Sequence, residues 1–288
     1  MSNILFSVLI ANYNNGQYIE EAINSVLVQS YTNWEIIIVD DSSSDNSKII
    51  YQKFSKNKKI KIYYNQENFG CTYTKSKCIQ YANGEICGFL DADDALLPYA
   101  IEKMVQIHKS KPNVSIIFSR HYVCDENFAI IRECDYLTIK EGKTYLTNMQ
   151  YGPWHFVSFK LSKYKQTIGL NTLHKIGDDQ ELYLLLEEKG DIYVLDELTY
   201  KYRERNNSIS HKENYRCWYW NLNIYYEACM RRGLNPEEYP YKLYLYLLDQ
   251  YAYKKIQKEL SDSTAYKIGK LLLTPLTLIK KISNNFHD

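Results

Sequence analysis

The N-terminal third of the chain alternates short apolar runs with amphipathic segments. Each run has the length of a strand and is rich in β-branched residues, which is typical of buried parallel strands. The four runs are Ile4 to Ile10, Trp34 to Val39, Ile60 to Tyr64 and Ile86 to Leu90. The helical segments between them end near Leu27, Phe54 and Tyr81. The pattern predicts β-α-β-α-β-α-β and a parallel sheet with right-handed crossovers.

The remaining two thirds keep this rhythm only in part. We expect a helix from Pro98 to about Ser110, an irregular region over 120–160 that faces partners, and a largely helical, aromatic-rich segment from Glu213 to the end. The other elements that we expect are a strand from Val114 to Phe118, a helix from Asp178 to Lys189, and two short strands, Ile192 to Leu195 and Leu198 to Tyr202.

Two of the predicted strands end in acidic residues, Asp40-Asp41 and the cluster from Asp91 to Asp94. Open α/β sheets place their ligand sites at the carboxyl ends of strands, so we expect the two groups to line one crevice. Crowded carboxylates repel one another and are most easily accommodated beside a divalent cation or ligand hydroxyls. Taken alone, however, the cluster is better explained as a solvated acidic loop.

Composition narrows the class of protein. The 288 residues can form one large domain, or a domain with an appendage, and a net charge of +1 gives no sign of a nucleic-acid partner. The seven cysteines include no Cys-x-x-Cys pair, so we expect no zinc site or disulfide framework and a reducing cytoplasm. We find neither a signal segment nor an apolar run long enough for a transmembrane helix. Dinucleotide, P-loop, hydrolase and zinc-protease motifs are also absent.

Several stretches form a pattern in their order and spacing: Ser7 to Asn14, Ser25 to Tyr31, Glu35 to Asp45, Asn68-Phe69-Gly70 and Gly84 to Asp94, with a looser match over residues 150–211. Together they resemble the family 2 glycosyltransferases, inverting enzymes of the GT-A fold. The resemblance implies a mostly parallel central sheet flanked by helices, with a Rossmann-like nucleotide-binding half. We therefore expect a catalytic domain over 1–211, with a donor half (1–120) and an acceptor half (121–211), and a helical C-terminal extension over 212–288.

The resemblance also assigns residues to the nucleotide-sugar donor. Ala11 and Tyr13 would form part of the base pocket, Asp41 would accept the base N–H, and Lys75 would meet the phosphate or ribose as a point charge. Each has a simpler alternative: a half-buried turn aromatic for Tyr13, a helix N-cap for Asp41 (a role that Asp40 could take instead), and a solvated helix residue for Lys75.

Asp91-Ala92-Asp93 matches the family's Asp-x-Asp motif, which holds Mn²⁺ or Mg²⁺ against the donor diphosphate. Such a cation would stabilise the charge that develops on the leaving phosphate. By this resemblance Asp93 is the main metal ligand, and Asp91 is a ribose contact or an outer ligand. Asp94 would support either role or cap the next helix.

An inverting single displacement needs a general base for the acceptor hydroxyl. The family places it at the start of a helix, and the spacing to Tyr183 aligns Asp179 with it, although the choice between Asp178 and Asp179 stays open. The alternative is that both carboxylates simply stabilise the helix N-terminus.

A later segment, from Tyr202 to His211, resembles the family's Tyr-Arg…Ser-x-Ser stretch. Arg203, Arg205 or His211 would reach the diphosphate or complete the metal shell, although Glu204 stands where many members have His. Trp154 and His155 fall where acceptor contacts usually come; a core Trp and a solvated loop His are the alternatives for Trp154 and His211.

The implied function is transfer of one sugar from a nucleoside diphosphate, UDP by preference, to a hydroxyl of a glycan. A lipid-linked acceptor in cell-surface polysaccharide assembly fits the basic, apolar tail, in which eight lysines from Tyr241 onward oppose four acids. Such a tail can lie on the inner face of an anionic plasma membrane, or pack on the core or a second subunit; we make no prediction of the oligomeric state. The alternatives are a non-catalytic glycan- or nucleotide-binding module and a sugar-1-phosphate nucleotidyltransferase. The last would need a basic Gly-rich loop that Asn12 to Gly16 does not supply.

Overall fold

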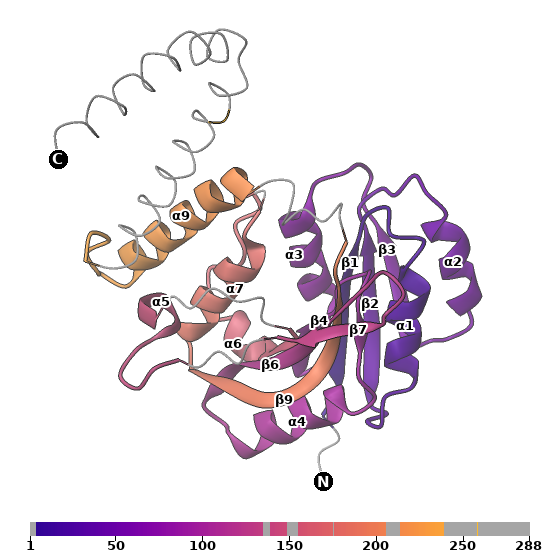
Figure 1. Ribbon diagram of the computed structural model, residues 1–288, viewed down its shortest axis with the longest axis horizontal. Helices are drawn as coiled ribbons and strands as arrows, with labels where there is room; N and C mark the ends of the chain where they lie inside the picture. Colours follow the sequence, from indigo (N-terminus) through magenta and orange to yellow (C-terminus); the bar gives the residue numbers. More distant parts are fainter. Residues whose placement is uncertain are drawn as a thin grey trace, which may run out of the picture.

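The computed structural model describes residues 4–134, 139–148, 155–174, 176–205, 214–238 and 258. Its N-terminal half is a four-stranded parallel sheet in the order β3-β2-β1-β4 (Figure 1). The strands are β1 (Phe6–Asn12), β2 (Trp34–Asp40), β3 (Ile60–Tyr64) and β4 (Ile86–Phe89). They are connected by α1 (Ile19–Leu27), α2 (Ser47–Phe54) and α3 (Cys71–Tyr81). The predicted β-α-β-α-β-α-β order and these boundaries are confirmed to within two residues at the strand and helix ends.

The sheet continues beyond β4 with strands of mixed direction. Its full order is β3-β2-β1-β4-β8-β6-β9-β5, and β7 pairs with β6 off this path. β8 is antiparallel to both of its neighbours, β4 and β6, whereas β6 and β9 are parallel. These strands are β5 (Ala95–Leu96), β6 (Val114–Cys124), β7 (Ile130–Glu133), β8 (Val157–Lys160) and β9 (Asp191–Arg203).

Two expectations for the part of the chain after β4 were wrong. The region 120–160 is not irregular throughout, because it contains the end of β6, all of β7, and β8 in the middle of the sheet. The two short strands expected from Ile192 are a single long strand, β9, which stays paired with β6 by shifting register near Phe118 and Arg120. The polar pair Asp196-Glu197 therefore interrupts the apolar pattern without interrupting the strand.

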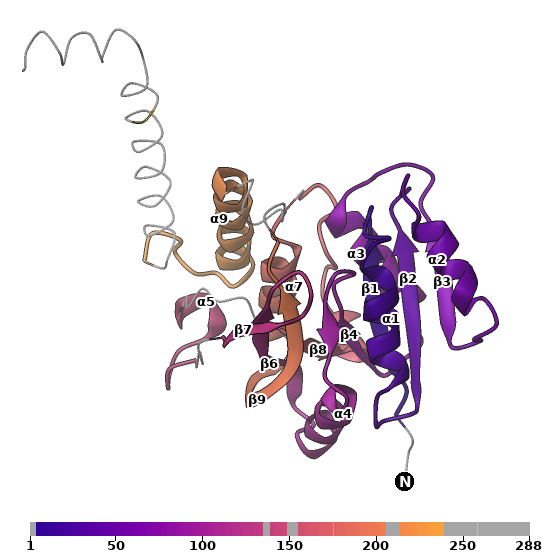
Figure 2. The same cartoon turned by 45° about the vertical axis from the view of Figure 1, so that its right-hand side comes forward.

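Helices cover both faces of the sheet (Figures 1 and 2). One apolar core joins the sheet to α1, α2 and α4 (Ala100–Ser110). The other core joins the opposite face to α3, α5 (Tyr145–Asn148), α6 (Leu161–Tyr164) and α7 (Asp178–Glu187). α9 (Asn214–Arg231) extends this second layer by packing on α7. Among the residues that the structure describes, no helix is both long and apolar enough to cross a bilayer.

The topology fixes where the acidic strand ends lie. β1 stands between β2 and β4, so Asp40-Asp41 and the Asp91 cluster share one edge of the sheet but do not follow adjacent strands. β8 lies on the other side of β4 and brings His155 to this edge from the opposite direction. Side chains from both halves of the chain therefore converge beyond the end of β4.

Candidate active site

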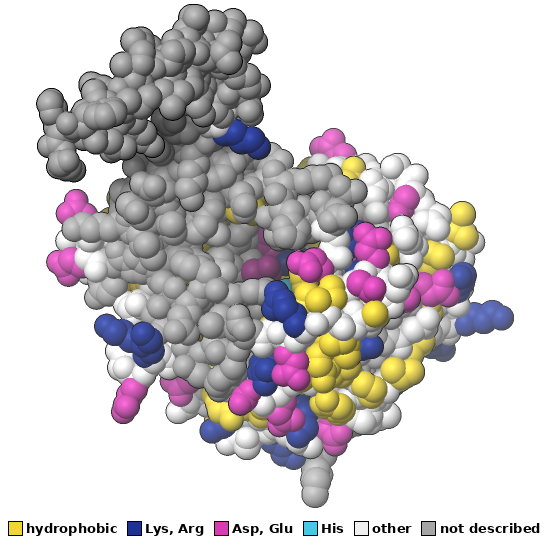
Figure 3. Space-filling model, in the orientation of Figure 1, with side chains coloured by type: hydrophobic (Ala, Val, Ile, Leu, Met, Phe, Trp, Pro, Cys, Tyr) yellow, Lys and Arg dark blue, Asp and Glu magenta, His cyan; other side chains and the backbone are white. Residues whose placement is uncertain are grey.

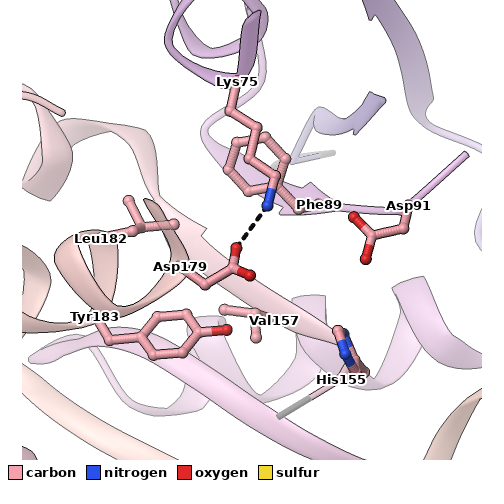
Figure 4. A pocket seen from close by; sticks show the side chains of 8 residues that line it. All are labelled: Lys75, Phe89, Asp91, His155, Val157, Asp179, Leu182 and Tyr183. Carbon is pink, nitrogen blue, oxygen red and sulfur yellow. Dashed lines mark hydrogen bonds and ion pairs between the residues drawn. The ribbon is translucent and has the colours of Figure 1, made fainter. Parts of the chain in front are cut away.

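A small pocket lies at the end of β4, between α3 and α7 (Figure 4). Four of the residues predicted for the site line it, and they come from four different parts of the chain: Lys75, Asp91, His155 and Asp179. Acidic and basic side chains lie side by side around a hollow on this face (Figure 3). Sequence reasoning missed the remaining lining residues, Phe89, Val157, Leu182 and Tyr183. Only Tyr183 carried a usable signal, since it lies one helical turn after Asp179 and so shares its face of α7.

Lys75 joins the two candidate bases. Its Nζ lies 2.6 Å from Asp178 Oδ2 and 2.6 Å from Asp179 Oδ1, which links α3 to the first turn of α7. The Lys75 and Asp178 side chains are only 7% and 8% exposed, whereas that of Asp179 is 46% exposed. Burial alone would lower the pKa of Lys75, but the charges of Asp178 and Asp179 outweigh it and hold that pKa well above its usual value. Lys75 is therefore a permanent cation between the two carboxylates.

The two carboxylates are not equivalent. Burial raises the pKa of Asp178 to about 6, although Lys75 opposes the rise. Burial also acts to raise the pKa of Asp179, but the charge and hydrogen bond of Lys75 outweigh it, so that pKa is lowered. Asp179 is thus the carboxylate that is both exposed to the pocket and ionised at neutral pH. Its geometry favours it over Asp178 as a group that receives a proton from an incoming hydroxyl.

The three acids after β4 have different surroundings. Asp94 is buried and accepts hydrogen bonds from the Tyr200 hydroxyl (2.8 Å) and the Arg203 backbone N–H (2.7 Å), so it ties this loop to β9. Burial, with the charges of Asp93 and Asp91, raises its pKa well above the usual value. Asp93 forms an ion pair with Arg205. Asp91 is half-buried and faces the pocket, and within the described part of the chain its carboxylate has no hydrogen-bond or ion-pair partner.

Asp91 and Asp93 fit a divalent cation. Both offer carboxylate oxygens, which Mn²⁺ and Mg²⁺ accept as ligands. Burial and the neighbouring charge of Asp91 raise the pKa of Asp93, and Arg205 counteracts this only in part. A bound cation would relieve the same repulsion that Arg205 relieves here. Asp94 is already used by Tyr200 and Arg203, so it is the least suited of the three acids to bind a cation.

The two arginines after β9 are placed differently. The Arg203 side chain is buried: its guanidinium lies 3.7 Å from the centre of the Phe128 ring, and its Nε donates to the Asp93 carbonyl oxygen over 2.7 Å. It also pairs with Glu21, so its role here is structural, and a diphosphate contact by Arg203 stays an untested prediction. Arg205 reaches Asp93, and its Nη1 donates to Asn15 Oδ1 over 3.2 Å. His211 lies outside the described residues.

The ends of β1 and β2 hold the residues assigned to the base. Tyr13 is 48% exposed, which leaves its ring open to a ligand. Asp40, not Asp41, caps the following turn, because its Oδ1 accepts the Ser43 backbone N–H over 2.7 Å. The Asp41 carboxylate instead accepts the backbone N–H groups of Phe69 (3.0 Å) and Gly70 (2.8 Å) at the start of α3. Its contact with a base, and that of the half-buried Ala11, stay predictions.

His155 forms part of an aromatic stack. Its ring packs parallel to Tyr200 and Tyr202, with ring centres 5.1 and 5.3 Å away. Burial lowers its pKa, and the nearby charges of Asp91 and Asp179 only partly oppose this, so the ring is neutral at pH 7. A neutral ring can still donate or accept one hydrogen bond at each nitrogen. Trp154, the other predicted acceptor contact, lies outside the described residues.

Comparisons with known proteins agree with this geometry. A family model described as "Glycosyl transferase family 2" matches residues 7–168. The putative teichuronic acid biosynthesis glycosyltransferase TuaG of Bacillus subtilis is 30% identical over 210 residues, which cover 72% of this chain and 81% of that protein. The UDP-Glc:alpha-D-GlcNAc-diphosphoundecaprenol beta-1,3-glucosyltransferase WfgD of Escherichia coli is 32% identical over 127 residues, 44% of this chain and 49% of that protein.

Solved structures share the fold at low sequence identity. S. aureus TarS 1-349, in complex with UDP, is 19% identical with a TM-score of 0.60, over 77% of this chain and 65% of that one. The mannosyltransferase PcManGT from Pyrobaculum calidifontis, in complex with GDP-Man and Mn²⁺, is 17% identical with a TM-score of 0.61, over 95% of this chain and 79% of that one. At these identities the likeness concerns the fold alone.

Proposed function

The chain belongs to glycosyl transferase family 2 and has the GT-A fold, and from this premise we propose that it is an inverting transferase that moves one sugar from UDP to a hydroxyl of a glycan. The observation that carries the proposal is the exposed, ionised Asp179 carboxylate, which lines the same pocket as Asp91. A base and a donor-side acid thus face one space in which a sugar can react.

On the donor side, Tyr13 and Asp41 hold the base, and Asp91 faces the ribose. Asp93, with Asp91, would hold Mn²⁺ or Mg²⁺, which when bound stabilises the negative charge that develops on the leaving diphosphate. Arg205 pairs with Asp93 here, and its guanidinium would be free to face the diphosphate if a cation held Asp93 instead. The mannosyltransferase PcManGT, whose structure contains Mn²⁺, supports the metal requirement.

On the acceptor side, Asp179 takes the proton of the acceptor hydroxyl. The freed oxygen attacks the anomeric carbon from the face opposite the diphosphate, a new C–O bond forms as the bond to the diphosphate breaks, and UDP leaves with its electron pair. Lys75 keeps Asp179 ionised before the reaction and remains charged throughout. His155, which lines the same pocket, contacts the acceptor.

We propose a lipid-linked acceptor in the assembly of a bacterial cell-surface polysaccharide, at the inner face of the plasma membrane. Two observations support this. WfgD acts, by its name, on a diphosphoundecaprenol-linked sugar, and TuaG by its name belongs to teichuronic acid biosynthesis. The tail from Tyr241 onward is basic and apolar, which suits an anionic membrane surface, although it lies outside the described residues apart from residue 258.

The test is the release of UDP. The full chain is incubated with individual UDP-sugars, with and without Mn²⁺ and with a lipid-linked acceptor, and UDP is measured over time. We expect metal-dependent release from one donor. Asp179→Asn should lower kcat by about 10²- to 10⁴-fold, the usual contribution of a general base, while Asp178→Asn keeps most of it.

Three outcomes would contradict parts of the proposal. Full activity of Asp93→Asn would refute the metal assignment. A larger loss of kcat in Asp178→Asn than in Asp179→Asn would exchange the two roles. Binding of UDP without release from any UDP-sugar, even with lipid-linked acceptors, would favour a non-catalytic binding module.

A further inference from the structure

A second titratable cluster lies on the far side of α7 from the pocket. His174, in the segment before α7, lies between Glu181 of α7 and Glu227 of α9. The His174 and Glu181 side chains are almost fully buried, at 4% and 1% exposed, whereas that of Glu227 is 40% exposed. One side chain comes from the segment before α7, one from α7 and one from α9. Together they connect α9 to the beginning of α7.

Each ring nitrogen of His174 faces a carboxylate, although Nδ1 makes no hydrogen bond in this geometry. Nδ1 lies 3.4 Å from Glu181 Oε2, and Nε2 lies 3.3 Å from Glu227 Oε1. The amide Nδ2 of Asn171 lies 3.2 Å from the same Nε2. A carboxylate beside a ring nitrogen requires an N–H there, whereas an amide donor requires a lone pair. Nε2 therefore faces two partners that it can satisfy only in different protonation states.

The two states have different structural consequences. A neutral ring, with its proton on Nδ1, keeps its polar contact with Glu181 and accepts from Asn171, so its contacts lie within residues 171–181. A doubly protonated ring keeps Glu181 and donates from Nε2 to Glu227, which adds an ionic contact to α9. From this geometry we infer that His174 is a positioning residue: as an imidazolium it bridges Glu181 and Glu227 and so anchors the first turn of α7 to α9.

The first turn of α7 carries the proposed base, so this inference rests on the proposed function. Glu181 lies two residues after Asp179, and its oxygens also accept the Asn171 backbone N–H over 3.1 and 3.2 Å. Gly177, which precedes the helix, has a φ of 95°, and a Cβ there would lie 2.7 Å from Asn221 Oδ1 of α9. α9 thus packs directly against the turn that starts α7, and loosening α9 frees that turn.

The direction of the pH dependence follows from the surrounding charges. The polar contact with Glu181, followed by the charges of Glu181 and Glu227, raises the pKa of His174 in spite of its burial. Those two carboxylates are the charged groups that face the ring among the described residues; the neutral Trp220 ring, 5.5 Å away, packs beside it. A raised pKa means that the bridge is complete below about 6.5, the unfolded value, and is lost as the pH rises through the folded value.

The test is hydrogen exchange of the full-length protein, which needs no substrate. Deuterium uptake of peptides covering 177–183 is measured at several pH values and corrected for the intrinsic rate. In the wild type we expect protection of this segment to fall as the pH rises through the pKa of His174. Glu227→Gln should lose protection on the order of tenfold at low pH, as expected for one charge-assisted hydrogen bond, and should show little further change with pH. An NMR titration of the His174 ring should show a lower pKa in this variant.

The matched control is Glu188→Gln. Glu188 also joins α7 to α9, through Arg231 at 3.0 Å, but at the other end of α7. This variant should keep the pH-dependent protection of 177–183. His174→Gln provides a second variant without a titrating ring and should behave as Glu227→Gln does.

Two results would overturn the inference. One is a pH response of 177–183 that is the same in the wild type and in Glu227→Gln. The other is stabilisation of the wild type by Zn²⁺ that Glu227→Gln abolishes, since this would assign the three side chains to a metal instead of a proton. Because exchange is measured without a donor, a failure of the proposed sugar transfer would leave both readouts unchanged.

Discussion

Replacing Lys75 with methionine removes a charge while keeping most of the side-chain volume. The variant therefore tests whether Lys75 keeps the proposed base, Asp179, ionised. In the wild type Lys75 neutralises Asp178 and Asp179 together, at 2.6 Å from each. Without it the two carboxylates repel each other in a site where Asp178 is almost fully buried. We expect one proton to be taken up and shared by the pair at neutral pH.

The expected loss of stability can be bounded. Removal of one partner of a buried ion pair typically costs about 3–5 kcal/mol, because a buried charge remains. Here Asp178 can be neutralised instead: its pKa is already about 6, and protonating such a group at pH 7 costs about 1.4 kcal/mol. Lys75→Met should therefore lose no more than about 1–2 kcal/mol at pH 7, and less at pH 5.

The catalytic loss should be larger than the loss of stability. A shared proton makes Asp179 a poor base for part of the molecules, so kcat at pH 7 should fall about 10- to 100-fold, less than the full contribution of about 10²- to 10⁴-fold that a general base makes. Raising the pH should restore part of this loss, because it removes the shared proton. The assays are urea denaturation at pH 5 and 7 and UDP release between pH 6 and 9.

The control for Lys75→Met is Lys77→Met, on the same helix. Lys77 is half-buried, donates to Gln80 Oε1 over 3.0 Å and does not line the pocket, so this variant should change neither measurement. A loss above about 3 kcal/mol at both pH values would refute the account of stability. A raised KM for the donor with an unchanged pH profile of kcat would show instead that Lys75 binds the phosphate.

Two further predictions concern stability. The folded pKa of Asp178, about 6, lies above its unfolded value, so the folded state binds more protons and wild-type stability should fall by about 2 kcal/mol from pH 4 to 6. Urea denaturation of Asp178→Asn should lack this fall, and a wild type whose stability is constant over the same range would contradict it. In Gly88→Ala, the new Cβ would lie 2.6 Å from Phe156 Cζ and 2.8 Å from Phe6 Cζ, both buried, so overpacking should cost about 1–3 kcal/mol. An unchanged urea midpoint would contradict this prediction, because it would show that the two phenyl rings shift to admit the methyl group without a loss of stability.

The N-terminal half could be predicted from the sequence because each of its strands is short, apolar and set off by turn formers. β8 could not be predicted in this way. It has four residues, and its place between β4 and β6 depends on hydrogen bonds to strands from Ile86 and Val114 onward, which local periodicity does not encode. The length of β9 was missed for a related reason: its pairing with β6 continues past the charged pair Asp196-Glu197.

In the candidate site, too, the sequence revealed local features but not contacts between distant segments. The resemblance to family 2 glycosyltransferases predicted Lys75, Asp91 and Asp179 as site residues, but not which of them touch. Lys75 was expected to face a phosphate, and the structure pairs it with carboxylates 103 and 104 residues further along the chain. Asp94 was left open as a metal or capping residue, and only the fold shows that Tyr200 and Arg203 use it. Contacts between distant segments are decided by packing, which a single sequence does not reveal.

The position of β8 has a consequence for protein engineering. Each of its edges is hydrogen-bonded, one to β4 and the other to β6, so the strand is shared by the two halves proposed at residue 120. A chimera that takes residues 121–211 from a relative would also import a new central strand. That strand would have to reproduce the register in which Ile86 faces Lys160 and Phe89 faces Val157. Exchange of acceptor specificity is therefore better attempted by grafting loops onto this sheet than by recombining the halves.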